Sequence, residues 1–134
     1  MPANPPVVYV PPSAGGPPAA PSAVFAPAPA GKAVLVISGV ATAGINGFVI
    51  YCGLINNKPA WSSDGTQTPG ASNTIVQSGD LGTVWTCSRD GVFGSNKVSS
   101  AATPDGLTSW TITLGSGSPV IAALAVPTPP VITA

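Results

Sequence analysis

The chain has 134 residues, which suits one small domain with an appendage. Four basic residues balance four acidic ones, so there is no basic stripe to neutralise nucleic-acid phosphates, and nucleic acid is not expected as a partner. Only 6% of the residues are charged, against roughly a quarter in a typical soluble domain, so we expect a neutral surface suited to contact with other protein.

Residues 1–31 form a segment of their own, because ten of the seventeen prolines lie in it. Proline fixes φ and lacks a backbone N–H, so this segment is predicted to be an extended arm without helix or central strand. Such a composition also fits a solvated linker. The arm nevertheless carries two apolar islands, and we expect them to anchor it on a partner chain. They are Val7, Val8, Tyr9 and Val10, followed by Val24 and Phe25.

The arm begins without a basic region or a continuous apolar run, so a signal peptide is not expected, and synthesis in a cytoplasm is favoured. The apolar stretches elsewhere fall short of the roughly 20 residues that a membrane-spanning helix needs. The membrane is therefore not expected as a partner.

Residues 32–126 are predicted to form an all-β domain, because short β-rich runs alternate with turn signals. Asn56-Asn57-Lys58 is typical of a hairpin connection, and three Asp-Gly pairs supply further turns. About seven or eight short strands at this spacing indicate a small antiparallel sandwich or barrel. The expected strands are 33–38, 48–54, 59–61, 74–77, 83–88, 97–100, 109–114 and 120–126. Residues 127–134 form a proline-rich tail.

Strand alternation predicts which side chains share a buried face. Trp85 and Trp110 are both expected in the core. The three faces expected to meet there are Phe48, Ile50 and Cys52; Trp85 and Cys87; and Trp110, Ile112 and Leu114. No charged residue follows Asp105, so the last strand is expected to be covered by another subunit.

The two cysteines, Cys52 and Cys87, are in phase with core residues, so they are candidates for a disulfide if the compartment is oxidising. Cytoplasmic synthesis favours two buried thiols instead. Both alternatives remain open at this stage.

Residues for catalysis are scarce, because the chain has neither histidine nor glutamate. The Ser-His-Asp and Cys-His mechanisms are excluded, and we expect no enzyme, no catalytic residue and no cofactor. Three of the four aspartates precede glycine and fit turns better than a metal site. Tyr51, Trp61 and Arg89 would form a sugar-stacking platform if they were exposed together, although such aromatic residues more often lie in cores or interfaces.

A pattern of turn residues and aromatics runs through residues 34–114. Its strings are Ile37-Ser38-Gly39, Gly44-Ile45-Asn46-Gly47-Phe48, Gly53 and Asn57-Lys58-Pro59-Ala60-Trp61, with Trp85 downstream. This pattern resembles a recurrent β module of tailed-bacteriophage virion proteins, including fibre and capsid-accessory components, with Val40-Ala41 in place of Ala-Gly and Asn57 in place of Gly.

This resemblance implies a structural virion protein of the capsid-decoration or head-fibre type, made in the host cytoplasm. Its partners would be other virion proteins of the capsid or tail, bound through the N-terminal arm, and further copies of itself in a homo-oligomer. The alternative is a receptor-binding tail-fibre module that recognises a cell-surface glycan through Tyr51, Trp61 and Arg89. A polysaccharide hydrolase is disfavoured because no carboxylate pair is present.

Overall fold

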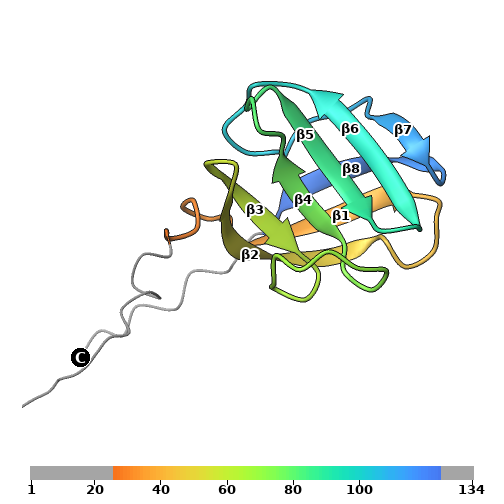
Figure 1. Cartoon of the computed structure of the whole chain (residues 1–134), viewed down its shortest axis with the longest axis horizontal. Coiled ribbons are helices and arrows are strands. Elements are labelled where there is room, and N and C mark those ends of the chain that lie inside the picture. The colour runs from red at the N-terminus through yellow and green to blue at the C-terminus, as the bar shows by residue number, and fades with distance from the viewer. Residues whose placement is uncertain (1–25, 125–134) are drawn as a thin grey trace, which may run out of the picture.

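The computed structural model describes residues 26–124, and this part of the chain is all-β, as the sequence predicts. Eight antiparallel strands form one sheet, shown in Figure 1. They are β1 (Val34–Val40), β2 (Gly47–Ile55), β3 (Lys58–Ser62), β4 (Ile75–Ser78), β5 (Val84–Arg89), β6 (Phe93–Val98), β7 (Thr111–Leu114) and β8 (Gly117–Ala123).

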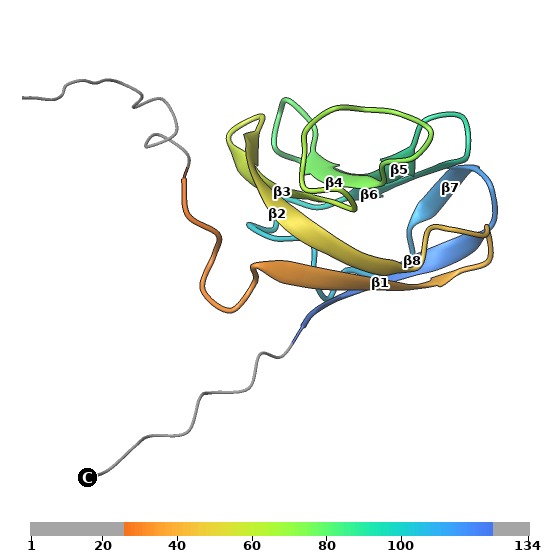
Figure 2. The ribbon, with the colours of Figure 1, turned by 90° about the horizontal axis from the view of Figure 1, so that it is seen from below.

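The sheet curls into a nearly closed barrel with the strand order β7-β6-β5-β4-β3-β2-β1-β8. Strands β1 to β7 form a meander, and β8 returns to pair with β1. Consecutive strands β7 and β8 thus stand at the two ends of the hydrogen-bonded order, and Figure 2 shows the sheet curving round to bring them together. The backbone N–H of Trp110 donates to Ser118 Oγ at 3.4 Å across this gap.

The β2–β3 connection is a two-residue hairpin, since Ile55 pairs with Lys58. Asn56 and Asn57 have φ values of 52° and 69°. Two consecutive left-handed residues define a type I′ turn, whose twist matches that of the flanking strands. Asparagine adopts this conformation more readily than most other residues with a Cβ, so the Asn-Asn pair favours this turn. The predicted hairpin is confirmed.

Large aromatic side chains fill the barrel. Trp61 and Trp85 are fully buried and their ring centroids lie 6.5 Å apart, while Trp110 is 6% exposed. The predicted burial of Trp85 and Trp110 is therefore confirmed. Aliphatic residues from β1, β2, β4 and β8 complete the core, among them Leu35, Ile37, Val49, Val76 and Ile121.

The predicted phase of β2 is wrong. Phe48 and Ile50 are 61% and 46% exposed, whereas Val49 between them is buried in the core. The pairing register shifts between Tyr51 and Gly53, which places a β-bulge at Cys52. Cys52 is buried, but it lies at the bulge and outside the core cluster. Its burial therefore does not mean that Phe48 and Ile50, at alternate positions before it, also point into the core.

Two further strand predictions need correction. The sixth strand runs Phe93–Val98 instead of 97–100, because its first half contains glycine, serine and asparagine, which carry little β signal. Leu114 was expected in the core but is 47% exposed at the end of β7, where the register with β6 shifts.

Candidate functional site

The point where the arm enters the barrel is held by core aromatics. The Tyr51 hydroxyl donates to the Ala26 carbonyl at 2.6 Å, and Trp61 Nε1 donates to the Lys32 carbonyl at 2.7 Å. Between these two points the Lys32 N–H closes a turn on the Pro29 carbonyl. Because the Tyr51 and Trp61 rings also meet edge to face, the entry segment 26–32 is attached directly to the core.

An ion pair adds a second attachment to this entry segment. Lys32 Nζ lies 3.2 Å from Asp105 Oδ2 and donates to Thr103 Oγ1 at 3.0 Å. Burial acts to raise the pKa of Asp105, but hydrogen bonding to Thr103 and Lys32 and the charge of Lys32 outweigh it, so the pKa lies below its usual value. The aspartate is thus held ionised beside the arm entry.

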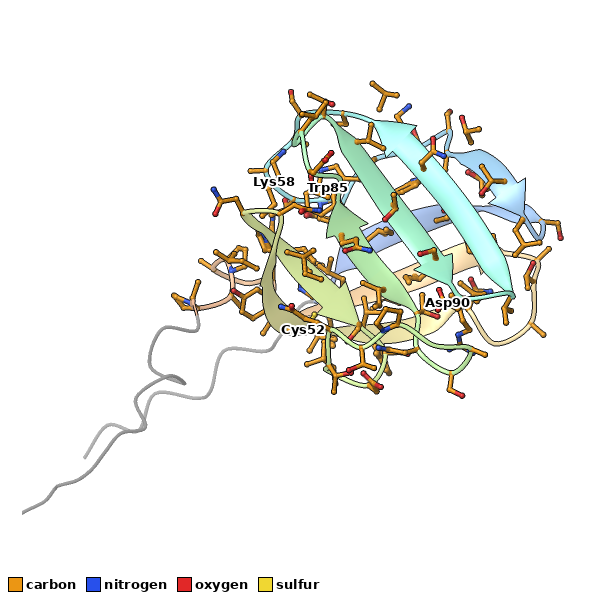
Figure 3. The ribbon with its side chains drawn as sticks, in the orientation of Figure 1. Cys52, Lys58, Trp85 and Asp90 are labelled. Atoms are coloured by element: carbon orange, nitrogen blue, oxygen red, sulfur yellow. The ribbon has the colours of Figure 1, made fainter. Side chains whose placement is uncertain are left out.

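Lys58 performs a similar structural task nearby. Its Nζ donates to the carbonyls of Gly82, Ser100 and Ala101 at 2.8, 3.2 and 3.0 Å and lies 5.6 Å from the centroid of the Trp85 ring. Figure 3 shows Lys58 and Trp85 side by side. Lys32 and Lys58 are therefore both engaged in internal contacts.

The β3–β4 loop is organised by one buried amide. Asn73 is 4% exposed; its Nδ2 donates to the carbonyls of Thr66 and Thr68, and its Oδ1 accepts from Ser63 and Asp64. The Asp64 carboxylate accepts from the hydroxyl and N–H of Thr66, which lowers its pKa. Asp64 thus closes a turn. Within residues 26–124, no three or more potential metal-ligating side chains lie together.

The two cysteines are not brought together. Both are free thiols. Cys87 pairs with Val76, Val76 with Trp61 and Trp61 with Tyr51, so Cys87 lies three strands from the bulge at Cys52. Along the curved sheet this is a path of roughly 14 Å at about 4.8 Å per strand, and Cys87 belongs to the core cluster whereas Cys52 does not, so the two thiols are not placed for a disulfide.

Both thiols have raised pKa values. Burial raises the pKa of Cys87 to about 12, with a small opposing contribution from a hydrogen bond with Ser95. Burial also raises the pKa of Cys52, which lies beside Ser62. Thiols that stay protonated are poor nucleophiles and poor metal ligands.

The sugar-stacking platform considered from the sequence does not form. Trp61 is fully buried in the core cluster, where its ring packs beside that of Trp85. Arg89 lies on β5, three strands from Tyr51 on β2, and its Nε donates to Thr74 Oγ1 at 3.0 Å. These three residues therefore do not form one exposed surface.

The outer surface of the barrel has two unlike halves. Across β4 to β7 the outward residues Gln77, Thr86, Asn96 and Thr111 form one polar row, each paired with the next. Across β8, β1 and β2 most outward residues are apolar, with Ser38 and Ser118 as polar exceptions, and we call the apolar part of this surface the apolar face. It comprises Val34, Val36, Phe48, Ile50, Val120, Ala122 and Leu124.

Sequence reasoning expected the last strand to be covered by another subunit, but it missed the β2 part of the apolar face because it assigned Phe48 and Ile50 to the core. A signal was nevertheless present. The run from residue 33 to 38 is almost continuously apolar, which is typical of a strand that is covered on both faces.

The predicted anchoring residues Val7, Val8, Tyr9, Val10, Val24 and Phe25 lie outside the described residues. Within residues 26–124 there is no detected pocket and no helix long and apolar enough to cross a membrane. Comparison of the chain with protein-family models, curated protein sequences and solved structures gave no match.

Proposed function

We propose that the protein is a structural component of a tailed-phage virion, of the capsid-decoration or head-fibre type, and that its N-terminal arm attaches it to the particle. The proposal draws on the resemblance of residues 34–114 to virion β modules. The structural observation that supports it best is the fixed arm entry at residues 26–32, held by Tyr51, Trp61 and Asp105.

A fixed entry matters because it sets the position from which residues 1–25 leave the barrel. A flexible tether needs only a covalent connection to its domain, so it does not require the hydrogen bonds from Tyr51 and Trp61, which also contribute to the stability of the barrel. In an anchor, the same bonds transmit the position of the bound arm to the whole barrel. The contacts at Ala26 and Lys32 are thus those that an anchoring arm would need.

Binding by the arm would be mainly apolar. Residues 1–25 contain no charged side chain, so their affinity should change little with ionic strength. Their eight prolines restrict the free arm, which reduces the entropy lost on docking. The two apolar islands, Val7–Val10 and Val24–Phe25, would fill pockets on a shell or tail protein.

The test is incorporation into particles that lack the protein. A chain without residues 1–25 retains Ala26 and Lys32, so it should fold normally but fail to bind the particles. In the full chain, replacing Tyr9 and Phe25 together with serine should weaken incorporation at both low and high salt. Normal occupancy by the shortened chain would rule out the arm as the attachment device.

The glycan-binding alternative is not supported by a specific observation. It required Tyr51, Trp61 and Arg89 to be exposed together, and Trp61 is fully buried.

A further inference from the structure

The apolar face on β8, β1 and β2 is a surface that the proposed anchoring does not use. Phe48 is 61% exposed, and Ile50, Val120 and Leu124 are 46%, 47% and 36% exposed. No charged residue belongs to this face, whereas the opposite half of the barrel carries the polar row from Gln77 to Thr111. Among the described residues, four of the eight exposed large hydrophobic side chains thus lie together on this one face, and such clustering is typical of an interaction surface.

Contact through the sheet edge is disfavoured at β8. Leu124 N–H bonds to the Val34 carbonyl, so alternate residues of β8 face β1, and Pro119 and Ile121 face the free edge. Pro119 has no N–H to offer, and the Ile121 carbonyl already accepts from Gly106. A partner therefore fits against the flat side of the strands better than against their edge.

The residues of the apolar face match a second copy of the same face. The register places Ala122, Val36 and Phe48 in one row, and Leu124, Val34 and Ile50 in the next. A two-fold axis parallel to β1 lays β2 of one copy over β8 of the other. Phe48, the largest side chain, then lies opposite Ala122, the smallest, and Val36 meets its own copy.

We propose that the apolar face is a self-association surface, on which two copies of this chain pack face to face about that axis. Each copy meets the same surface, as an isologous dimer requires, and no like charges oppose each other. The three strands span about 25 Å by 14 Å, or roughly 350 Å² per copy, which is less than half of the about 800 Å² per partner in a standard stable interface. The dimer is therefore weak between free chains and is strengthened where neighbouring copies are held together.

The test is sedimentation of the full chain between about 10 µM and 1 mM, the range expected for a small interface. The average mass of the wild-type chain should rise from 13.0 kDa toward twice that value. Val120→Lys on the apolar face should raise the dissociation constant at least tenfold. The matched control is Val98→Lys, which alters the 75% exposed valine on β6 and should leave it unchanged.

Thermal unfolding shows whether each variant is folded, and Phe48→Lys serves as a second variant if Val120→Lys is not. A wild-type chain that stays monomeric up to about 1 mM would overturn the proposal. So would equal weakening by Val120→Lys and Val98→Lys, because association would then use another surface. Neither result bears on anchoring by the arm, which is measured on particles.

Discussion

Individual polar side chains in this protein mainly form hydrogen bonds that hold its loops in place. Asn46 shows this most simply, since its side chain accepts from the Val40 N–H and donates to the Val40 carbonyl. Asn73 does the same for the β3–β4 loop, and Lys58 joins two other loops over Trp85. With only 6% charged residues, loop geometry depends on these single amide and ammonium groups.

Such roles were not predictable from the sequence. An asparagine or lysine in a turn looks the same whether it faces water or a carbonyl from a distant loop. Lys58 and Ala101, for example, are separated by 43 positions. The burial of Trp85 and Trp110 was predictable, because a large apolar side chain in phase with its neighbours has few places other than a core.

Trp85→Ala should be among the most damaging single substitutions. It would leave a cavity in the core and remove the bond from Nε1 to the Ala101 carbonyl and the ring beneath Lys58. We expect a loss of about 3 to 5 kcal/mol in the free energy of unfolding, measured by urea denaturation. Trp85→Phe, which keeps most of the ring volume, should lose less. Wild-type stability in Trp85→Ala would contradict the packing described.

At the scale of elements, hairpins were easier to predict than strand phase. The Asn56-Asn57 turn is a local signal, and its backbone preference is decided by two residues. The phase of β2 depended on a bulge at Cys52, which arises from pairing with β3 and has no sequence signature of its own. Beyond a bulge, alternation no longer shows which side of the strand faces the core.

The turn supplies a test at this scale. Asn57 has φ 69°, so Asn57→Gly should stabilise the protein by a few tenths to about 1 kcal/mol, and Asn57→Ala should destabilise it by about 1 kcal/mol. Asn56→Gly should gain less, because Asn56 Nδ2 also donates to the Ser78 carbonyl. The three variants are compared by thermal unfolding. Greater stability of Asn57→Ala than of Asn57→Gly would show that the left-handed turn is not populated.

For the whole molecule, the sequence did not distinguish a sandwich from a barrel. The pairing between the first and last strands decided between these two architectures. Leu35 pairs with Ala123, a contact across most of the domain that no local pattern specifies. The same pairing creates the apolar face, since it sets β8 beside β1, which pairs with β2 on its other side. Interaction surfaces built from distant strands are therefore harder to predict than the strands themselves.

The entry segment gives a whole-molecule prediction about where the folded unit begins. A chain that starts at Ala26 keeps the carbonyl that accepts from Tyr51 and should unfold at the wild-type temperature. A chain that starts at Lys32 keeps the Trp61 and Asp105 contacts but loses the Tyr51 contact, so it should be less stable by about 0.5 to 1.5 kcal/mol and still unfold cooperatively. A chain that starts at Val34 also loses the partners of Trp61 and Asp105. Its loss of stability should be the largest of the three because a buried indole N–H is left unpaired.

Tyr51→Phe in the full chain is the matched control for the chain that starts at Lys32, since it removes the same hydrogen bond without shortening the chain. Equal stability of all three shortened chains would mean that residues 26–33 add nothing to the fold, and the fixed arm entry would lose its physical basis.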